Sequence, residues 1–217
     1  MPIDINAAQY QIVRQLKIRA VNDCIPKFAE AAIRVAIFVR ENKYDAILMS
    51  GRSSLISREF FSAAWRALFP EIPLPKIYNF GDTGNFILYQ GSLDPASRVK
   101  SAQSYIDSNF PDLNLRRSGK LCYVDDCALA GGKRNGLRDI FERLGFDRVD
   151  FAFLASSDRF LPREQDYVAI KDSSIAGTVR TFAGDIGLTD PEMNHAEIIH
   201  RTIAIIGMQA NRMRMAA

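Results

Sequence analysis

The segment LCYVDDCALAGGK spans residues 121 to 133 and joins four features in a fixed order. Its apolar start, residues 121 to 124, is typical of a buried strand. Asp125 and Asp126 follow, and then a turn of small residues that contains two glycines. Residues 135 to 145 predict a helix, because apolar side chains recur there at helical spacing and Gly145 is suited to cap it. This order is typical of an open α/β sheet, whose ligands bind beyond the carboxyl ends of the strands.

The glycine turn is suited to an anion. Gly131 and Gly132 let the backbone approach a ligand closely, and the following helix offers free N–H groups and a partial positive charge. Asp125 and Asp126 are placed to hydrogen-bond sugar hydroxyls or to hold a divalent metal through oxygen ligands. A phosphorylated sugar with Mg²⁺ is therefore a coherent ligand, although strand-to-helix turns of this composition also occur in α/β folds without that role.

A second unit of the same kind precedes the first. The apolar run of residues 44 to 49 predicts a buried strand. It is followed by a turn and then by another predicted helix, and the turn contains Ser50, Gly51, Arg52 and Ser53. Arg52 is able to hold an oxyanion in a bidentate fork, while the Ser53 hydroxyl donates or caps the helix. In the alternative interpretation, Ser53 is a plain N-cap and Arg52 is a solvated side chain. Two such turns in one sheet favour the anion site.

The remaining pattern extends this alternation. Further strands are predicted at residues 76 to 80, 148 to 155 and 167 to 170, a helix at 95 to 108 and a loop at 172 to 177. Alternating strands and helices imply parallel neighbours joined by right-handed crossovers. We therefore expect an α/β fold with a doubly wound, mostly parallel sheet of four to five strands and helices on both faces.

The length of 217 residues suits one domain. We expect residues 1–42 to form N-terminal helices, residues 43–171 the α/β core with an insertion at about 81–118, and residues 172–217 a divergent C-terminal hood and helix. That last segment includes a helix predicted from Asp190 to about Arg214, whose apolar face is suited to the core or to a homodimer contact. The insertion is suited to act as a lid, with Arg98 and Lys100 as candidate cations, or it is a plain excursion with two solvated charges.

Composition narrows the classes of function. The net charge of +3 is spread along the chain, so it gives no clear signal for nucleic acid and suits a polyanionic small ligand equally well. The three cysteines are too few for a disulfide framework and fit a reducing cytoplasm. The first residues do not resemble a signal peptide, and no apolar run approaches a membrane span. We therefore expect a cytoplasmic protein.

The segment from Tyr123 to Lys133 resembles the ribosyl-phosphate motif of type I phosphoribosyltransferases. In that motif, an apolar strand, two acids and further apolar residues lead to Thr-Gly-Gly-Thr or a variant of it. The earlier Ser50-Gly51-Arg52 looks like the family's pyrophosphate loop, which follows the first core strand. The resemblance covers roughly residues 42 to 156, and it implies a flexible lid loop in the insertion and a base-selecting hood in the C-terminal segment.

The resemblance also implies roles for individual residues. Asp125 and Asp126 would contact the ribose hydroxyls of phosphoribosyl pyrophosphate and Mg²⁺. The 5′-phosphate would be wrapped by Leu129, Ala130, Gly131, Gly132 and Lys133. The Mg²⁺-bound pyrophosphate would be met by Ser50, Gly51, Arg52 and Ser53. The implied activity is that of a glycosyltransferase of nucleotide metabolism, which moves the phosphoribosyl group to a nucleobase-like acceptor, and many members of the family form dimers.

Three residues depart from the family's pattern. Ala130 replaces the usual first threonine, and Lys133 replaces the last hydroxyl residue with an ammonium. Leu129 stands where purine-salvage members carry a carboxylate that acts on the base, so this chain lacks that general base. These departures leave open a non-catalytic alternative, in which the fold serves as a nucleotide sensor, regulator or scaffold. The acceptor base is not specified, because no motif stands out in the C-terminal segment.

Two other classes of protein fit this sequence less well. A response-regulator receiver would place further strands, a phosphoacceptor aspartate and a distal lysine after the acidic pair, and the chain shows no such run. A Walker-type NTPase would carry a serine or threonine after Lys133, where this chain has Arg134.

Overall fold

Residues 5–49, 51, 54–81, 94–180 and 195–216 are described by the structure, a computed structural model. They contain one five-stranded sheet in the order β2-β1-β3-β4-β5. Its strands are β1 (Ala46–Met49), β2 (Lys76–Asn79), β3 (Lys120–Ala128), β4 (Arg148–Ser156) and β5 (Asp166–Lys171). All four pairings are parallel. The predicted parallel α/β sheet is therefore confirmed.

The three inner strands form the centre of the core. β1 is buried throughout, and β3 is buried from Leu121 to Asp126. The edge strands β2 and β5 are only partly buried. The sequence of an inner strand is a continuous run of apolar residues because helices cover both of its faces. The acidic pair of β3 is thus an exception, two carboxylates at the end of a buried strand.

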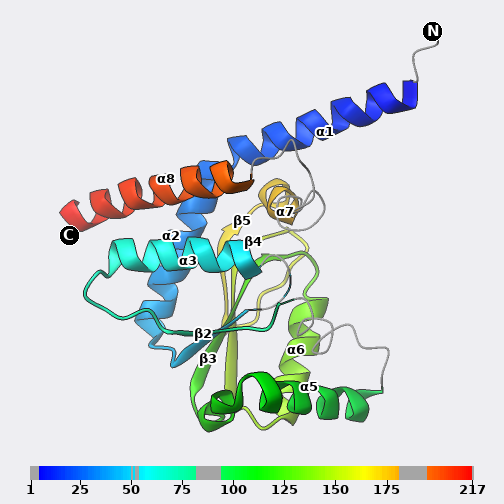
Figure 1. The fold of residues 1–217 in the computed structure, drawn as a ribbon, viewed down its shortest axis with the longest axis vertical. Coiled ribbons are helices and arrows are strands. Elements are labelled where there is room, and N and C mark those ends of the chain that lie inside the picture. Colours follow the sequence, from blue (N-terminus) through cyan, green and yellow to red (C-terminus); the bar gives the residue numbers. More distant parts are fainter. Residues whose placement is uncertain (1–4, 50, 52–53, 82–93, 181–194, 217) are drawn as a thin grey trace.

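One face of the sheet is covered by the helices from the two ends of the chain (Figure 1). They are α2 (Ile25–Asn42), α3 (Ser54–Leu68), α7 (Ser173–Arg180) and α8 (His195–Ala216). The side chains of α2 that recur at helical spacing are all buried: Phe28, Ala32, Val35, Ala36 and Val39. Helix α1 (Ile5–Asp23) runs outward from this layer toward the N-terminus (Figure 1).

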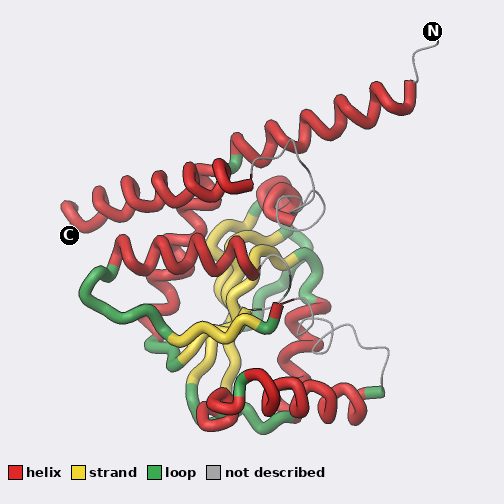
Figure 2. The backbone as a smooth tube through the Cα atoms, viewed as in Figure 1, coloured by secondary structure: helices red, strands yellow, loops and turns green. Residues whose placement is uncertain are grey.

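The other face is covered by α5 (Pro95–Asn109), the short 3₁₀ helix η2 (Pro111–Arg116) and α6 (Gly132–Arg143). The tube in Figure 2 shows the strands between these two layers of helices. Aromatic rings fill much of this side, for example Phe80 and Phe110 with ring centroids 5.1 Å apart. Helices on both faces, as expected, complete the doubly wound arrangement.

The predicted loop at residues 172 to 177 is wrong, because helix α7 begins at Ser173. The carboxylate of Asp172 caps this helix by accepting the N–H groups of Ser174, at 2.8 Å, and Ile175, at 3.2 Å. Ile175 and Ala176 are buried in the core beside the sheet. A cap and two buried side chains stabilise a helix that its composition does not favour.

Two expected features fall partly on residues 82–93 and 181–194, which lie outside the described residues. They are the lid in the insertion and the hood at the C-terminal end, including the helix start predicted at Asp190. In the described part, the predicted helix of the insertion is α5, and α8 packs against α2 and α3. No helix among the described residues is both long and apolar enough to cross a membrane.

Candidate functional site

The turn between β3 and α6 depends on the backbone of Gly131. This residue has a φ of 79°, in the left-handed region that favours glycine, and stands at the N-cap of α6. Its carbonyl accepts the first helical hydrogen bond, from the N–H of Asn135 at 3.0 Å. The three preceding amides, of residues 132 to 134, belong to the first turn, where helices leave N–H groups without helical partners. The turn therefore offers a row of donors and the positive end of the helix dipole.

Ser157, which directly follows β4, holds the turn from the neighbouring strand. Its N–H donates to the carbonyl of Ala128 at 3.0 Å, and its hydroxyl donates to the carbonyl of Leu129. Both carbonyls belong to the exit from β3. The path of the turn is thus fixed by hydrogen bonds to β4 as well as by its own glycines.

A cavity of about 430 Å³ opens at this turn. It is lined by every residue from Asp125 to Arg134 and by Phe153 of β4. All of the predicted ribose and 5′-phosphate residues, the acidic pair and residues 129 to 133, therefore meet at one cavity. Its volume lies in the range of small-molecule sites, which run from roughly 300 to 1,000 Å³.

The two carboxyl groups of the cavity differ in their surroundings. One oxygen of Asp125 accepts the ammonium of Lys133 at 2.8 Å, and the other accepts the backbone N–H of Asp126 at 3.1 Å. Burial, together with the charge and a hydrogen bond of Asp125, raises the pKa of Asp126 to about 8. This shift favours the protonated form of Asp126 at neutral pH, and a protonated carboxyl both donates and accepts hydrogen bonds.

Lys133 keeps its charge in a partly buried position. Burial alone would lower the pKa of its ammonium, but the attraction of Asp125 and of Tyr123 outweighs that effect and raises it. The ammonium also lies 5.6 Å from the centre of the Tyr123 ring. The side chain is 28% exposed and lines the cavity. A fixed positive charge is therefore present at the wall of the cavity.

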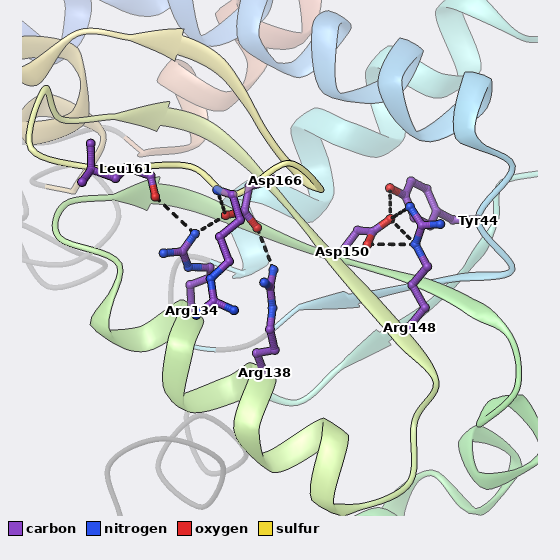
Figure 3. Close-up of polar contacts among 8 residues, drawn as sticks. Tyr44, Arg134, Arg138, Arg148, Asp150, Leu161 and Asp166 are labelled. Atoms are coloured by element: carbon purple, nitrogen blue, oxygen red, sulfur yellow. Dashed lines mark hydrogen bonds and ion pairs between the residues drawn. The ribbon is translucent and has the colours of Figure 1, made fainter.

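A buried ionic cluster adjoins the same wall (Figure 3). Asp166, at the start of β5, accepts hydrogen bonds from the guanidinium groups of Arg134 and Arg138. It also accepts the backbone N–H of Arg163 at 2.8 Å. Both arginines are buried, and Arg134 lines the cavity. Two guanidinium groups share one carboxylate, so the cluster retains one excess positive charge beside the anion turn.

This cluster could not be predicted from the sequence. Arg134 directly follows the predicted motif, but its partner Asp166 is 32 residues away and comes from another strand. The second cluster in Figure 3 is at the start of β4, where Asp150 accepts hydrogen bonds from Tyr44 and Arg148. None of its residues lines the cavity of the turn. It joins β4 to the chain just before β1 and stabilises the sheet.

The other predicted site residues either do not line this cavity or lie outside the described residues. Gly51 is buried with a φ of 89°, and its N–H donates to the carbonyl of Gly81 at 2.9 Å. Ser50, Arg52 and Ser53 lie outside the described residues, so the pyrophosphate loop stays a prediction. Arg98 and Lys100 are on α5 and do not line the cavity of the turn. Their role as lid cations likewise stays a prediction.

Comparisons with known proteins assign no family. No protein-family model matches the chain, and no curated protein matches it significantly. A solved phosphoheptose isomerase from Francisella tularensis is 16% identical, with 96% of this chain and 99% of that chain covered and a TM-score of 0.42. A mutant hypoxanthine phosphoribosyltransferase from Trypanosoma cruzi, complexed with the product IMP, is 12% identical, with coverages of 69% and 74% and a TM-score of 0.40. Similarities this weak leave the function to be argued from the cavity.

Proposed function

We propose that the chain binds phosphoribosyl pyrophosphate in the cavity of residues 125 to 134 and transfers its phosphoribosyl group to a nucleobase-like acceptor. One observation carries this proposal: the acidic pair and the glycine turn line a single cavity between the end of β3 and the start of α6. The motif's resemblance to that of type I phosphoribosyltransferases supports the same assignment.

Each part of the cavity matches one part of this ligand. The first amides of α6, the helix dipole and the excess charge of the Arg134 cluster suit the 5′-phosphate. The ribose hydroxyls need both donors and acceptors. A charged Asp125 next to a protonated Asp126 supplies both.

The transfer requires charge stabilisation more than covalent chemistry. The bond between C1 of the ribose and the pyrophosphate oxygen breaks, and pyrophosphate leaves with the electron pair. C1 then forms a bond to a ring nitrogen of the acceptor, whose proton passes to solvent. Positive charge develops on the ribose ring in between. Preorganised charges beside the sugar stabilise such a state. Asp125, 4% exposed and fixed by Lys133, is a suitable group.

A second candidate is a non-catalytic nucleotide sensor or regulator on the same fold. Two features of the turn favour it. Leu129 is aliphatic, so the turn holds no carboxylate that could act on an acceptor base. Asp125 is already engaged by Lys133. In this case the cavity would hold a nucleotide without turnover.

Two measurements separate these candidates. The first is calorimetry with phosphoribosyl pyrophosphate, and the second is an assay of pyrophosphate release with a panel of purine and pyrimidine bases. Binding with release by some base supports the transferase, and binding without release supports the sensor. Absence of binding would make the transferase proposal wrong, and absence of binding of a nucleoside 5′-monophosphate in the same calorimetry would make the sensor proposal wrong. Asp125→Asn should weaken binding about tenfold or more, since a charged hydrogen-bond partner is lost. Asp139→Asn, on an exposed part of α6, is the matched control and should bind normally.

A further inference from the structure

Lys133 lies at the carboxylate where the resemblance would place a divalent metal. Its ammonium is 2.8 Å from one oxygen of Asp125, and the other oxygen accepts the N–H of Asp126. Both oxygens of Asp125 therefore already have partners. The aromatic face of Tyr123 supports the same ammonium from a second direction.

The residues at this wall do not fit a resident Mg²⁺. This ion requires near-octahedral oxygen ligands at about 2.0–2.1 Å, so it would have to displace Lys133 from Asp125 or bind beside an ammonium of like charge. The neighbouring carboxyl, Asp126, is buried and interacts with Asp125. No group of three or more histidine, cysteine, aspartate or glutamate side chains suited to a metal occurs within the described ranges.

Lys133 is placed to supply the positive charge that a metal ion would otherwise supply at this wall. An ammonium has three N–H donors, and Asp125 is the one carboxylate hydrogen-bonded to it among the residues that the structure describes. The side chain is partly exposed and lines the cavity, so its other donors are available to ligand oxygens. The first amides of α6 and the Arg134 cluster add positive potential at the same place. These groups together suit the two negative charges of a phosphate monoester.

We propose that Lys133 is the fixed cation of this site and that the ligand's ribose 5-phosphate end is bound without a divalent metal. This inference rests on the proposed function and deepens it, because it names Lys133, in place of a divalent metal, as the cation that the ligand meets at this wall of the cavity. Any Mg²⁺ would then accompany a pyrophosphate group as part of the substrate.

The test is calorimetry of the full chain with ribose 5-phosphate, once in excess EDTA and once in excess Mg²⁺. The dissociation constants of the wild type should agree within about twofold. Lys133→Met should weaken binding in EDTA by about 10- to 100-fold, which corresponds to one charge-assisted hydrogen bond. Lys133→Arg keeps the charge and should retain part of the affinity. Lys27→Met, which changes an exposed lysine of α2, is the control and should bind as the wild type does.

Thermal unfolding of each variant shows whether a loss of binding is caused by a failure to fold. If Lys133→Met does not fold because Asp125 is left buried without a partner, the double variant Asp125→Asn with Lys133→Met removes both charges. It is compared with Asp125→Asn alone and should bind more weakly than that single variant. Wild-type binding that requires Mg²⁺, or normal binding by a folded variant without Lys133, would overturn this inference alone. Absence of binding in both buffers would overturn the proposed function and this inference together.

Discussion

Gly131 combines a left-handed backbone with crowded surroundings. A Cβ atom at this position would lie 3.1 Å from the guanidinium of Arg134 and 3.3 Å from the ring of Phe160. Gly131→Ala should therefore lower the free energy of unfolding by about 1–3 kcal/mol, the cost of a non-glycine residue in this conformation. It should also abolish binding of ribose 5-phosphate, because the turn must move. Urea unfolding and calorimetry measure the two effects.

Gly207→Ala is the matched control for this substitution. Gly207 is inside helix α8, and a Cβ atom there would meet nothing within 4 Å. Alanine should raise the free energy of unfolding by about 0.5–1 kcal/mol, since glycine is unfavourable inside a helix. If Gly131→Ala proved as harmless as Gly207→Ala, the left-handed turn would not be the basis of the site.

Asp126 makes the stability of the protein depend on pH. Its pKa is raised to about 8 in the folded chain, against about 3.9 in an unfolded chain, because of burial and the charge of Asp125. Between these values the folded state holds a proton that the unfolded state has lost, so this group's contribution to stability falls as pH rises from about 4 to 8. Asp126→Asn, which cannot ionise, should therefore match the wild type near pH 4.

The same variant should be more stable than the wild type near pH 8, by on the order of a few kcal/mol. Thermal unfolding of both proteins across this pH range gives the difference directly. A constant difference between the two curves would show that Asp126 is not held in its protonated form. Asp125 and Lys133, the charged groups that act on Asp126, are present in both the wild type and the Asp126→Asn variant.

The residues of the site were predictable where they are neighbours in the sequence. The acidic pair and the glycine turn meet at one cavity because a strand end and the following helix start must be adjacent in space. Phe153 and the Arg134 cluster could not be predicted, since they depend on which strands pair. The pairing of Lys133 with Asp125 could not be predicted either, because it depends on the direction of a long side chain.

Helix α7 shows the limit of prediction for a short element. It has eight residues, two of them serine and one glycine, so neither length nor composition indicates a helix. The longer helix α6 was found because its apolar spacing is clear. α7 instead depends on the cap at Asp172 and on burial of Ile175 and Ala176. Such contacts come from tertiary structure, which overrides weak local preferences.

Asp172→Ala removes that cap and tests its contribution. The free energy of unfolding should fall by about 1 kcal/mol, the usual cost of replacing an N-cap residue by alanine. Asp172→Asn should have little effect, because asparagine caps helices about as well as aspartate. Urea unfolding measures both variants. Equal losses in the two variants would indicate that the charge of Asp172, and not its hydrogen bonds to Ser174 and Ile175, stabilises this part of the chain.

The assembly of the whole molecule joins segments from the two ends of the chain. Figure 1 shows α8 in one layer with α2 and α3. The sequence indicated parallel strands and an apolar C-terminal helix, but neither the strand order nor the surface that this helix covers. Both depend on contacts between distant residues, such as the register that places Asp125 beside Phe153. The sequence left core packing and a dimer contact as alternatives for α8.

Two substitutions on α8 separate these alternatives. Ile206 is fully buried with residues of α2 and α3, so Ile206→Ala should lower the free energy of unfolding by about 2–5 kcal/mol. Met213 is 46% exposed on the same helix, and Met213→Ala should change the free energy of unfolding by about 0.5 kcal/mol or less. Urea unfolding measures both. A large loss in Met213→Ala, with a midpoint that rises with protein concentration, would place the outer side of α8 in a contact between two copies of the chain, because only association makes stability depend on concentration.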